Sequence, residues 1–166
     1  QHERMQVTLA SIGDGVIVCD HEFKVTFLNS IAESLTGWSS SEAIGQSLST
    51  VFNIVNEDTR EHVENPATQA IREGIIVGLA NHTVLISRQG KNIPIDDSAS
   101  PIRDAQRNVS GAILVFRDVT QRRNEERRLY EAAEFTRSIV DTLGELVVVL
   151  DREMQVLHVN RAFSTT

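Results

Sequence analysis

The sequence predicts an α+β domain in which an antiparallel sheet carries its helices on one face, followed by a long connecting helix. Three observations lead to this fold class. Two short β-branched runs, 15–20 and 24–29, are separated by a polar turn, a helical middle follows, and the last strand-like runs are joined only by short turns. Because parallel strands need long crossover connections, these last runs must pair in antiparallel fashion.

Helix signals fill the middle of the domain. A capping box at Ser30 and Glu33 opens one helix, and a second capping box at 39–42 opens a shorter one. The stretch 48–74 has helical composition, with Pro66 suited to a first helical turn. We therefore expect three helices between the two groups of strands.

The hydrophobic period changes after the third expected helix. The runs 79–87 and 92–104 alternate as strands do and are joined at 88–91, where a glycine suits a tight turn. A polar turn then leads to an apolar strand at 111–116. The expected order is two strands, three helices and three strands.

The sequence of the first hairpin occurs twice. Residues 12–32 and 143–163 match at a constant offset of 131 residues, which pairs Asp20 with Asp151. Such self-similarity indicates one structural unit and the beginning of another. The chain is accordingly expected to comprise an N-terminal helix or linker (1–6), a domain (7–120), a signalling or coiled-coil connector helix (121–142) and the truncated start of a second domain (143–166).

Composition narrows the partners and the chemistry. The net charge of −7 argues against nucleic acid, because phosphate binding needs a basic surface. Cys19 is the sole cysteine, which favours a reducing, cytoplasmic location. No apolar run is long enough to span a bilayer, so no membrane contact is expected. No catalytic constellation is visible, so we expect no catalysis in this segment.

The order and spacing of these pieces resemble the PAS family over 7–120. The matching pieces are the hairpin from Asp20 to Asn29, LTGWSSSEAIGQSL at 35–48, RQGKNIPIDDSASPI at 88–102 and GAILVFRDVTQRR at 111–123. The repeated hairpin then looks like the opening of a second PAS domain. The resemblance implies a five-stranded antiparallel sheet cupping a cavity, within a bacterial signalling protein such as a histidine kinase or a cyclic-di-GMP cyclase or phosphodiesterase.

Two hairpin residues have expected structural roles: Asp20 braces the hairpin and Asn29 caps the first helix. The resemblance gives Asp118-Val119-Thr120 the role of the exit motif, where the last strand leads into a signalling helix. Asp118 or Thr120 can accept amide hydrogens at that helix N-terminus.

The connector helix has a weak heptad pattern. Its a positions are Arg122, Leu129, Thr136 and Leu143, and its d positions are Glu125, Ala132 and Ile139. Since only the last turns are apolar, the seam is weak. We expect a parallel homodimer through this helix and the PAS surface, with a surface helix that bridges two domains as the alternative.

Apolar position alone selects candidates for the cavity lining: Ile31, Leu35, Phe52, Ile71, Leu85, Ile113 and Val115. Core packing is the default explanation for each of them. The first functional hypothesis is a sensor that binds a small apolar ligand or metabolite and relays through the exit helix. The alternative is a ligand-free dimerisation and relay module.

A haem-based gas sensor is the third hypothesis, and the cofactor stays open. His62 lies about where haem-binding PAS domains carry their proximal histidine, and His82 is a weaker candidate. A lone histidine beside Glu61 and Glu64 is more often an exposed helix residue. Flavin is not expected, because the light-sensing subgroup needs a cysteine in its helical region, whereas Cys19 lies in the first strand.

Overall fold

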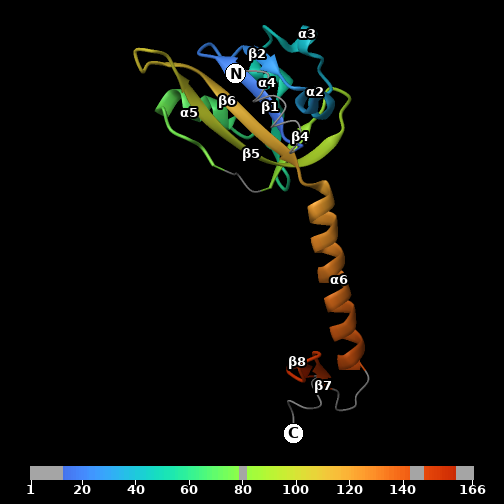
Figure 1. Cartoon of the computed structure of the whole chain (residues 1–166). Helices are drawn as coiled ribbons and strands as arrows, with labels where there is room; N and C mark the ends of the chain where they lie inside the picture. The colour runs from blue at the N-terminus through green and yellow to red at the C-terminus, as the bar shows by residue number, and fades with distance from the viewer. Residues whose placement is uncertain (1–12, 79–81, 143–147, 160–166) are drawn as a thin grey trace. The chain divides into compact units, whose positions relative to one another are not determined.

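The computed structural model describes residues 13–78, 82–142 and 148–159 (Figure 1). The chain divides into two units, 1–120 and 121–166. The first contains β1 (Gly15–Asp20), β2 (Val25–Leu28), α2 (Ser30–Thr36), α3 (Ser40–Ala43), α4 (Leu48–Val51), β3 (Asn53–Asn56), α5 (Pro66–Glu73), β4 (Thr83–Ile86), β5 (Asn92–Arg103) and β6 (Val109–Asp118). After these come α6 (Thr120–Thr142), β7 (Val148–Leu150) and β8 (Val156–Val159).

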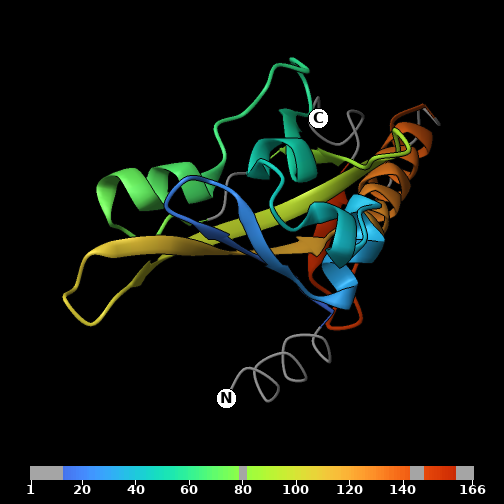
Figure 2. The same cartoon turned by 90° about the horizontal axis from the view of Figure 1, so that it is seen from above.

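The strands of the first unit form one antiparallel sheet in the order β2-β1-β6-β5-β4-β3. Residues of α2, α4 and α5 share a single buried cluster with β1 and β6, so these helices cover the same face of the sheet. The helix α5 lies beside β5 and β6 in both views of the chain (Figures 1 and 2). The predicted α+β class is therefore confirmed.

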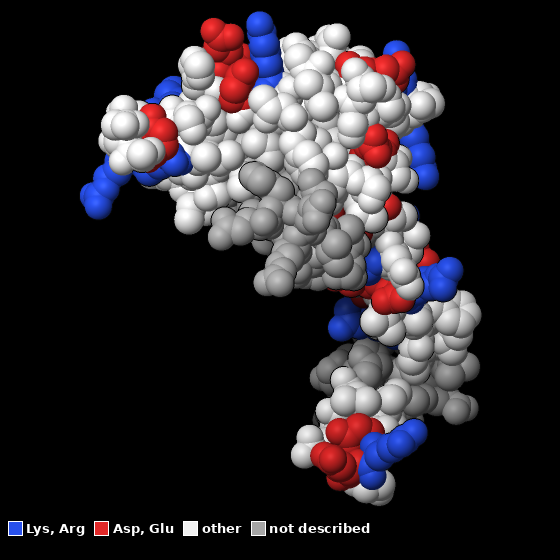
Figure 3. Space-filling model, turned by 45° about the horizontal axis from the view of Figure 1, so that its top comes forward, with Lys and Arg blue, Asp and Glu red and all other residues white. Residues whose placement is uncertain are grey.

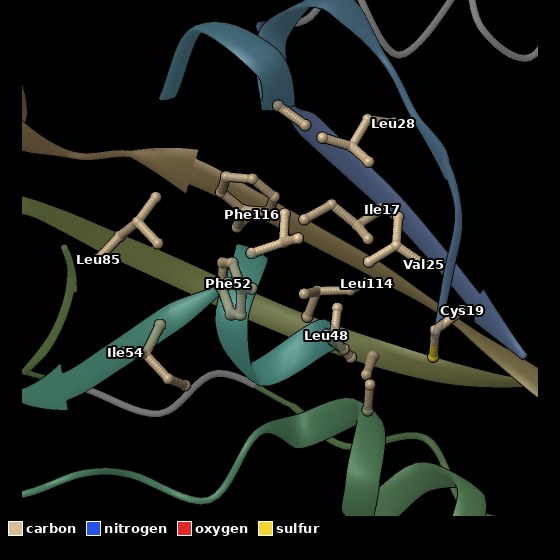
Figure 4. Close-up of a cluster of buried hydrophobic side chains, with 14 of the residues drawn as sticks. Ile17, Cys19, Val25, Leu28, Leu48, Phe52, Ile54, Leu85, Leu114 and Phe116 are labelled. Atoms are coloured by element: carbon tan, nitrogen blue, oxygen red, sulfur yellow. The ribbon is translucent and has the colours of Figure 1, made fainter. Parts of the chain in front are cut away.

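The core is built by alternate residues of the central strands (Figure 4). Ile17 of β1 lies opposite Leu114 of β6, and both are buried. The ring of Phe116 meets that of Phe52, with 4.8 Å between the ring centroids and an interplanar angle of 51°. Burying each such apolar side chain contributes about 1.5–3 kcal/mol, so this face stabilises the unit.

One expected helical region is wrong in part. The stretch 48–74 contains α4, the strand β3, a turn and α5, and the sheet therefore has six strands where five were expected. β3 is a pair of β-branched residues, Ile54 and Val55, between two asparagines, and it pairs with β4. The side chain of Asn56 accepts two amide hydrogens of the following turn, which ends the strand.

Short stretches of backbone cover both edge strands of the sheet. On β2, the Val25 amide donates to Gln46 O at 2.9 Å, and Val25 O accepts from the Gly45 amide at 2.8 Å. On β3, Ile54 O accepts from the Val63 amide at 3.3 Å. The edges consequently present fewer unpaired backbone groups than a bare strand would.

The turn between β1 and β2 is organised by Asp20. Its Oδ1 accepts the amide hydrogens of Glu22 and Lys24 at 2.9 and 3.0 Å, and Phe23 takes a positive φ of 62°. The same turn, with an aspartate at its head and a positive φ three residues later, recurs between β5 and β6 (Asp104, Gln106, Arg107, Asn108) and between β7 and β8 (Asp151, Glu153, Met154, Gln155).

The second unit contains α6 and a two-stranded sheet. In that sheet β7 pairs with β8 in antiparallel register, with an irregularity between Val149 and Leu150 that matches the one between Val18 and Cys19 in the first hairpin. The expected N-terminal linker, 1–6, and the expected helix start after Asn160 lie outside the described residues.

Candidate functional site

The structure places five of the predicted cavity residues on or near the core. Phe52 and Leu85 belong to the buried cluster, and Leu35 and Ile71 are partly buried against it. Ile31 is half-buried at the start of α2. Phe52 and Leu85 are the fully buried members of this set.

Two of the predicted cavity residues were assigned to the wrong face. In β6 the residues Ala112, Leu114 and Phe116 are buried on the helix-covered side, whereas Ile113 and Val115 alternate with them. Successive side chains of a strand point to opposite faces, so Ile113 and Val115 lie on the outer face of the sheet. The run 111–116 is apolar throughout, so it has no alternation of polar and apolar residues that would show which side chains face the core.

The interior also contains a carboxylate, which was not among the predicted site residues. Asp97 is 1% exposed and lies opposite Phe116 in the ladder between β5 and β6. The alternation of β5 gave the signal, since it aligns Asp97 with the buried Ile95 and Ala99. Burying a carboxylate is costly unless it is compensated, so this position differs in kind from its apolar neighbours.

Cys19 belongs to the same buried cluster. Burial raises the pKa of its thiol from 9.0 to about 11. Since the thiolate is the nucleophilic form, this cysteine is a packing residue at neutral pH. Its place in β1 agrees with the sequence-based interpretation of a structural thiol.

The two candidate histidines are surface residues. His62 is exposed and forms an isolated antiparallel bridge with Val55, so it lies in an extended segment and not in a helix as expected. His82 is exposed too, with Nδ1 3.6 Å from a carboxylate oxygen of Glu57. Within the described ranges, no group of three or more His, Cys, Asp or Glu residues could hold a metal ion.

The end of β6 forms a compact exit site. Asp118 Oδ1 accepts the amide hydrogen of Thr120, the first residue of α6, at 2.8 Å. Val119 between them is buried, and its amide donates to Pro94 O of β5 at 3.0 Å. Asp118 thus accepts the amide hydrogen of Thr120, and Val119 between these two residues is held to β5 by its backbone hydrogen bond.

The entry to β1 lies at the same place. Arg117 Nε donates to Asp14 Oδ1 at 2.6 Å, and this hydrogen bond is the main reason that the pKa of Arg117 is raised. The side chain of Asn29 accepts from the Val16 amide at 3.0 Å and donates to Asp14 O at 2.9 Å. It also caps α2 by accepting from the Ala32 amide at 2.8 Å, as expected.

The helix α6 exposes large apolar side chains. Leu129, Tyr130, Phe135 and Ile139 are all exposed on it. No helix among the described residues is long and apolar enough to cross a membrane. On the face drawn in Figure 3, Lys and Arg side chains are scattered among Asp and Glu side chains.

The antiparallel sheet buries its interior under α2, α4 and α5, and the long helix α6 follows its last strand. The model of the PAS fold matches residues 3–119, and a PAS domain model matches residues 134–166. The chain belongs to the PAS family.

Three characterised relatives are signalling proteins. The chain is 33% identical over 133 residues to "Probable diguanylate cyclase DgcE" of Escherichia coli, covering 80% of this chain and 12% of that protein. It is 30% identical to the cyclic di-GMP phosphodiesterase PdeB of Shewanella oneidensis (81% and 15% covered) and 29% identical to the histidine kinase AtoS of Escherichia coli (89% and 22% covered). The chain thus spans less than a quarter of each relative and is homologous to a sensor region of these proteins.

A solved structure supports the fold. The PAS domain of a protein from Colwellia psychrerythraea superimposes with a TM-score of 0.57 at 20% identity, covering 72% of this chain and 97% of that one. At this identity the likeness concerns the fold alone.

Proposed function

We propose that this chain is a regulatory segment of a multidomain bacterial signalling protein, and that its first PAS domain binds a small apolar ligand and relays through α6. The output enzyme is a histidine kinase or a cyclic-di-GMP enzyme located elsewhere in the parent protein. The three relatives support this assignment, because they are a cyclase, a phosphodiesterase and a kinase. The single cysteine favours a cytoplasmic location.

The observation that carries the proposal is the continuity of β6. Leu114 and Phe116 face the interior, and the exit site begins with the next residues, Arg117 and Asp118. A ligand that displaced Phe116 would therefore move a side chain only two residues from the group that holds the first turn of α6. A movement of β6 on ligand binding would therefore also move the first residues of α6.

A ligand-free relay is the second candidate. The ring contact between Phe52 and Phe116 favours it, because these two fully buried side chains pack against each other. In this case the domain transmits a signal that arises elsewhere, and a close-packed core is the better transmitter.

A pair of neighbouring substitutions separates the two candidates. Ala99 is buried on the interior face of β5, whereas Ser98 lies on the outer face. If the interior holds space for a ligand, Ala99→Leu should be tolerated and should abolish any ligand retained in native mass spectrometry. If the core is closed, Ala99→Leu should destabilise the domain by about 1–3 kcal/mol. Ser98→Leu is the matched control and should do neither.

The haem hypothesis has a direct test. Because His62 is exposed and pairs with Val55 in an extended segment, we expect no Soret band in protein expressed with sufficient iron. A Soret band that His62→Ala removed would restore haem sensing as the function.

We further propose that the chain forms a parallel homodimer through α6 and the outer face of the sheet. Leu129 occupies an a position of the heptad and Tyr130 the neighbouring b position, and the two are 73% and 69% exposed. The outer face of the sheet adds Ile113 and Val115, which are half-buried. Leu129→Glu should lower the dimer fraction in light scattering, whereas Tyr130→Glu should leave it unchanged. Equal effects of the two variants would contradict the heptad seam.

A further inference from the structure

The entry and the exit of the first unit meet in one cluster of polar contacts. Asp14 directly precedes β1, and Arg117 lies at the end of β6, yet their side chains form an ion pair of 2.6 Å. The Asp14 side chain is only 15% exposed, and its main-chain carbonyl is held by the Asn29 side chain. The main chain of Asp14 is therefore held by a contact other than its ion pair with Arg117.

The other end of the pair is fixed as well. Arg117 lies opposite Asp96 in the ladder between β5 and β6, and it directly precedes Asp118, which accepts the first amide of α6. Val119 is anchored by its buried side chain and its hydrogen bond to β5. Arg117, the partner of Asp14, is thus followed within three residues by the start of α6, and Val119 in this stretch is held to β5.

We propose that the Asp14–Arg117 ion pair couples the conformation of the segment that enters β1 to that of the helix that leaves β6. An input from upstream then biases α6 without any change in the buried interior. The coupling is reciprocal, as any equilibrium coupling between two sites must be. It is independent of the ligand proposed above. The second copy of the repeat has an acid, Glu145, at the place that matches Asp14.

Hydrogen exchange on the full chain tests the coupling in both directions. Asp14→Asn should raise the exchange of amides 124–128 in α6 by about two- to fivefold, although it lies at the entry. Arg117→Gln should raise the exchange of the Val16 amide by a similar factor, although it lies at the exit. Asp14→Glu keeps the charge and should restore most of the protection.

Two comparisons make the test decisive. Arg88→Gln breaks an ion pair of 2.7 Å with Glu42 elsewhere on the surface and should leave α6 and Val16 unchanged. The double variant Asp14→Asn/Arg117→Gln should exchange no faster than the single variants if the two residues act through each other. The proposal would be overturned if the rate increases of the two single variants multiplied in the double variant. It would also be overturned if Asp14→Asn affected only the entry and Arg117→Gln only the exit.

Discussion

The two hairpins of this chain share their turn and differ in their burial. Asp20 and Asp151 accept the same pair of amide hydrogens, and Phe23 and Met154 take the same positive φ. Ile17, Cys19 and Val25 are 0%, 3% and 1% exposed, whereas their counterparts Val148, Leu150 and Val156 are 39%, 40% and 59% exposed.

The comparison shows that the turn depends on local sequence alone, whereas burial of the strands depends on the rest of the domain. The turn forms in both places because an aspartate side chain satisfies nearby amides without help from the rest of the fold. Burial requires partners, which β6 and the helices provide for the first copy. An isolated hairpin is marginal in water, so the second copy should be the weaker unit.

The largest effect expected from this comparison concerns the buried face. Ile17→Ala should lower the free energy of unfolding of the first unit by about 2–5 kcal/mol, because it opens a cavity in the core. The matched change Val148→Ala should cost less than about 0.5 kcal/mol, since that side chain is exposed. Urea denaturation followed by circular dichroism measures both. Equal losses would show that the second hairpin is also part of a packed domain.

A pH effect should distinguish Cys19 from its counterpart Leu150, which does not titrate. The pKa of Cys19 is raised from 9.0 to about 11 in the folded state, so the unfolded chain loses this proton first as the pH rises. The stability that the protonated Cys19 thiol contributes to the folded state is therefore fully present below pH 9 and is lost between pH 9 and about 11. Unfolding free energies of the wild type should fall more steeply across this window than those of Cys19→Ala. Parallel curves would contradict the shift.

The turns should respond to loss of their aspartate by about 1 kcal/mol, the value of one or two exposed hydrogen bonds. Asp20→Ala and Asp104→Ala should lower the melting temperature of the first unit, whereas Asp20→Asn, which keeps the acceptor, should lower it less. Asp151→Ala should leave that transition unchanged and raise only amide exchange around Glu153. A shift of the first unit's transition by Asp151→Ala would mean that the two hairpins unfold together.

The smallest effect concerns the residue of positive φ. Arg107 is exposed and takes a φ of 65°. This backbone conformation is unfavourable for any residue that has a Cβ atom, but glycine adopts it at little cost in free energy. Arg107→Gly should stabilise the first unit by about 0.5 kcal/mol, because relief of the positive φ exceeds the cost of the extra freedom that glycine gives the unfolded chain. Arg107→Ala is the control and should not stabilise it. If calorimetry found that Arg107→Gly is destabilised, the positive φ at Arg107 would not be an unfavourable feature of this turn.

Features that depend on nearby residues were predicted well from the sequence. The first hairpin, the cap at Asn29 and the acceptor at Asp118 all follow from a side chain and its near neighbours. The strand β3 was not predicted, because its four residues become a strand only by pairing with β4, far along the chain. The faces of Ile113 and Val115 were misassigned for a similar reason, since a uniformly apolar strand takes its phase from its neighbours.

The covered edges of the sheet have a consequence for chains that carry related domains in series. Similar domains joined by a short tether meet at effective concentrations on the order of millimolar, where open strands of one domain readily pair with those of the next. Gly45 and Gln46 on one edge, and Val63 on the other, occupy backbone groups that such mispairing would use. The loops beside β2 and β3 therefore leave fewer backbone groups on the edges of the sheet for such pairing.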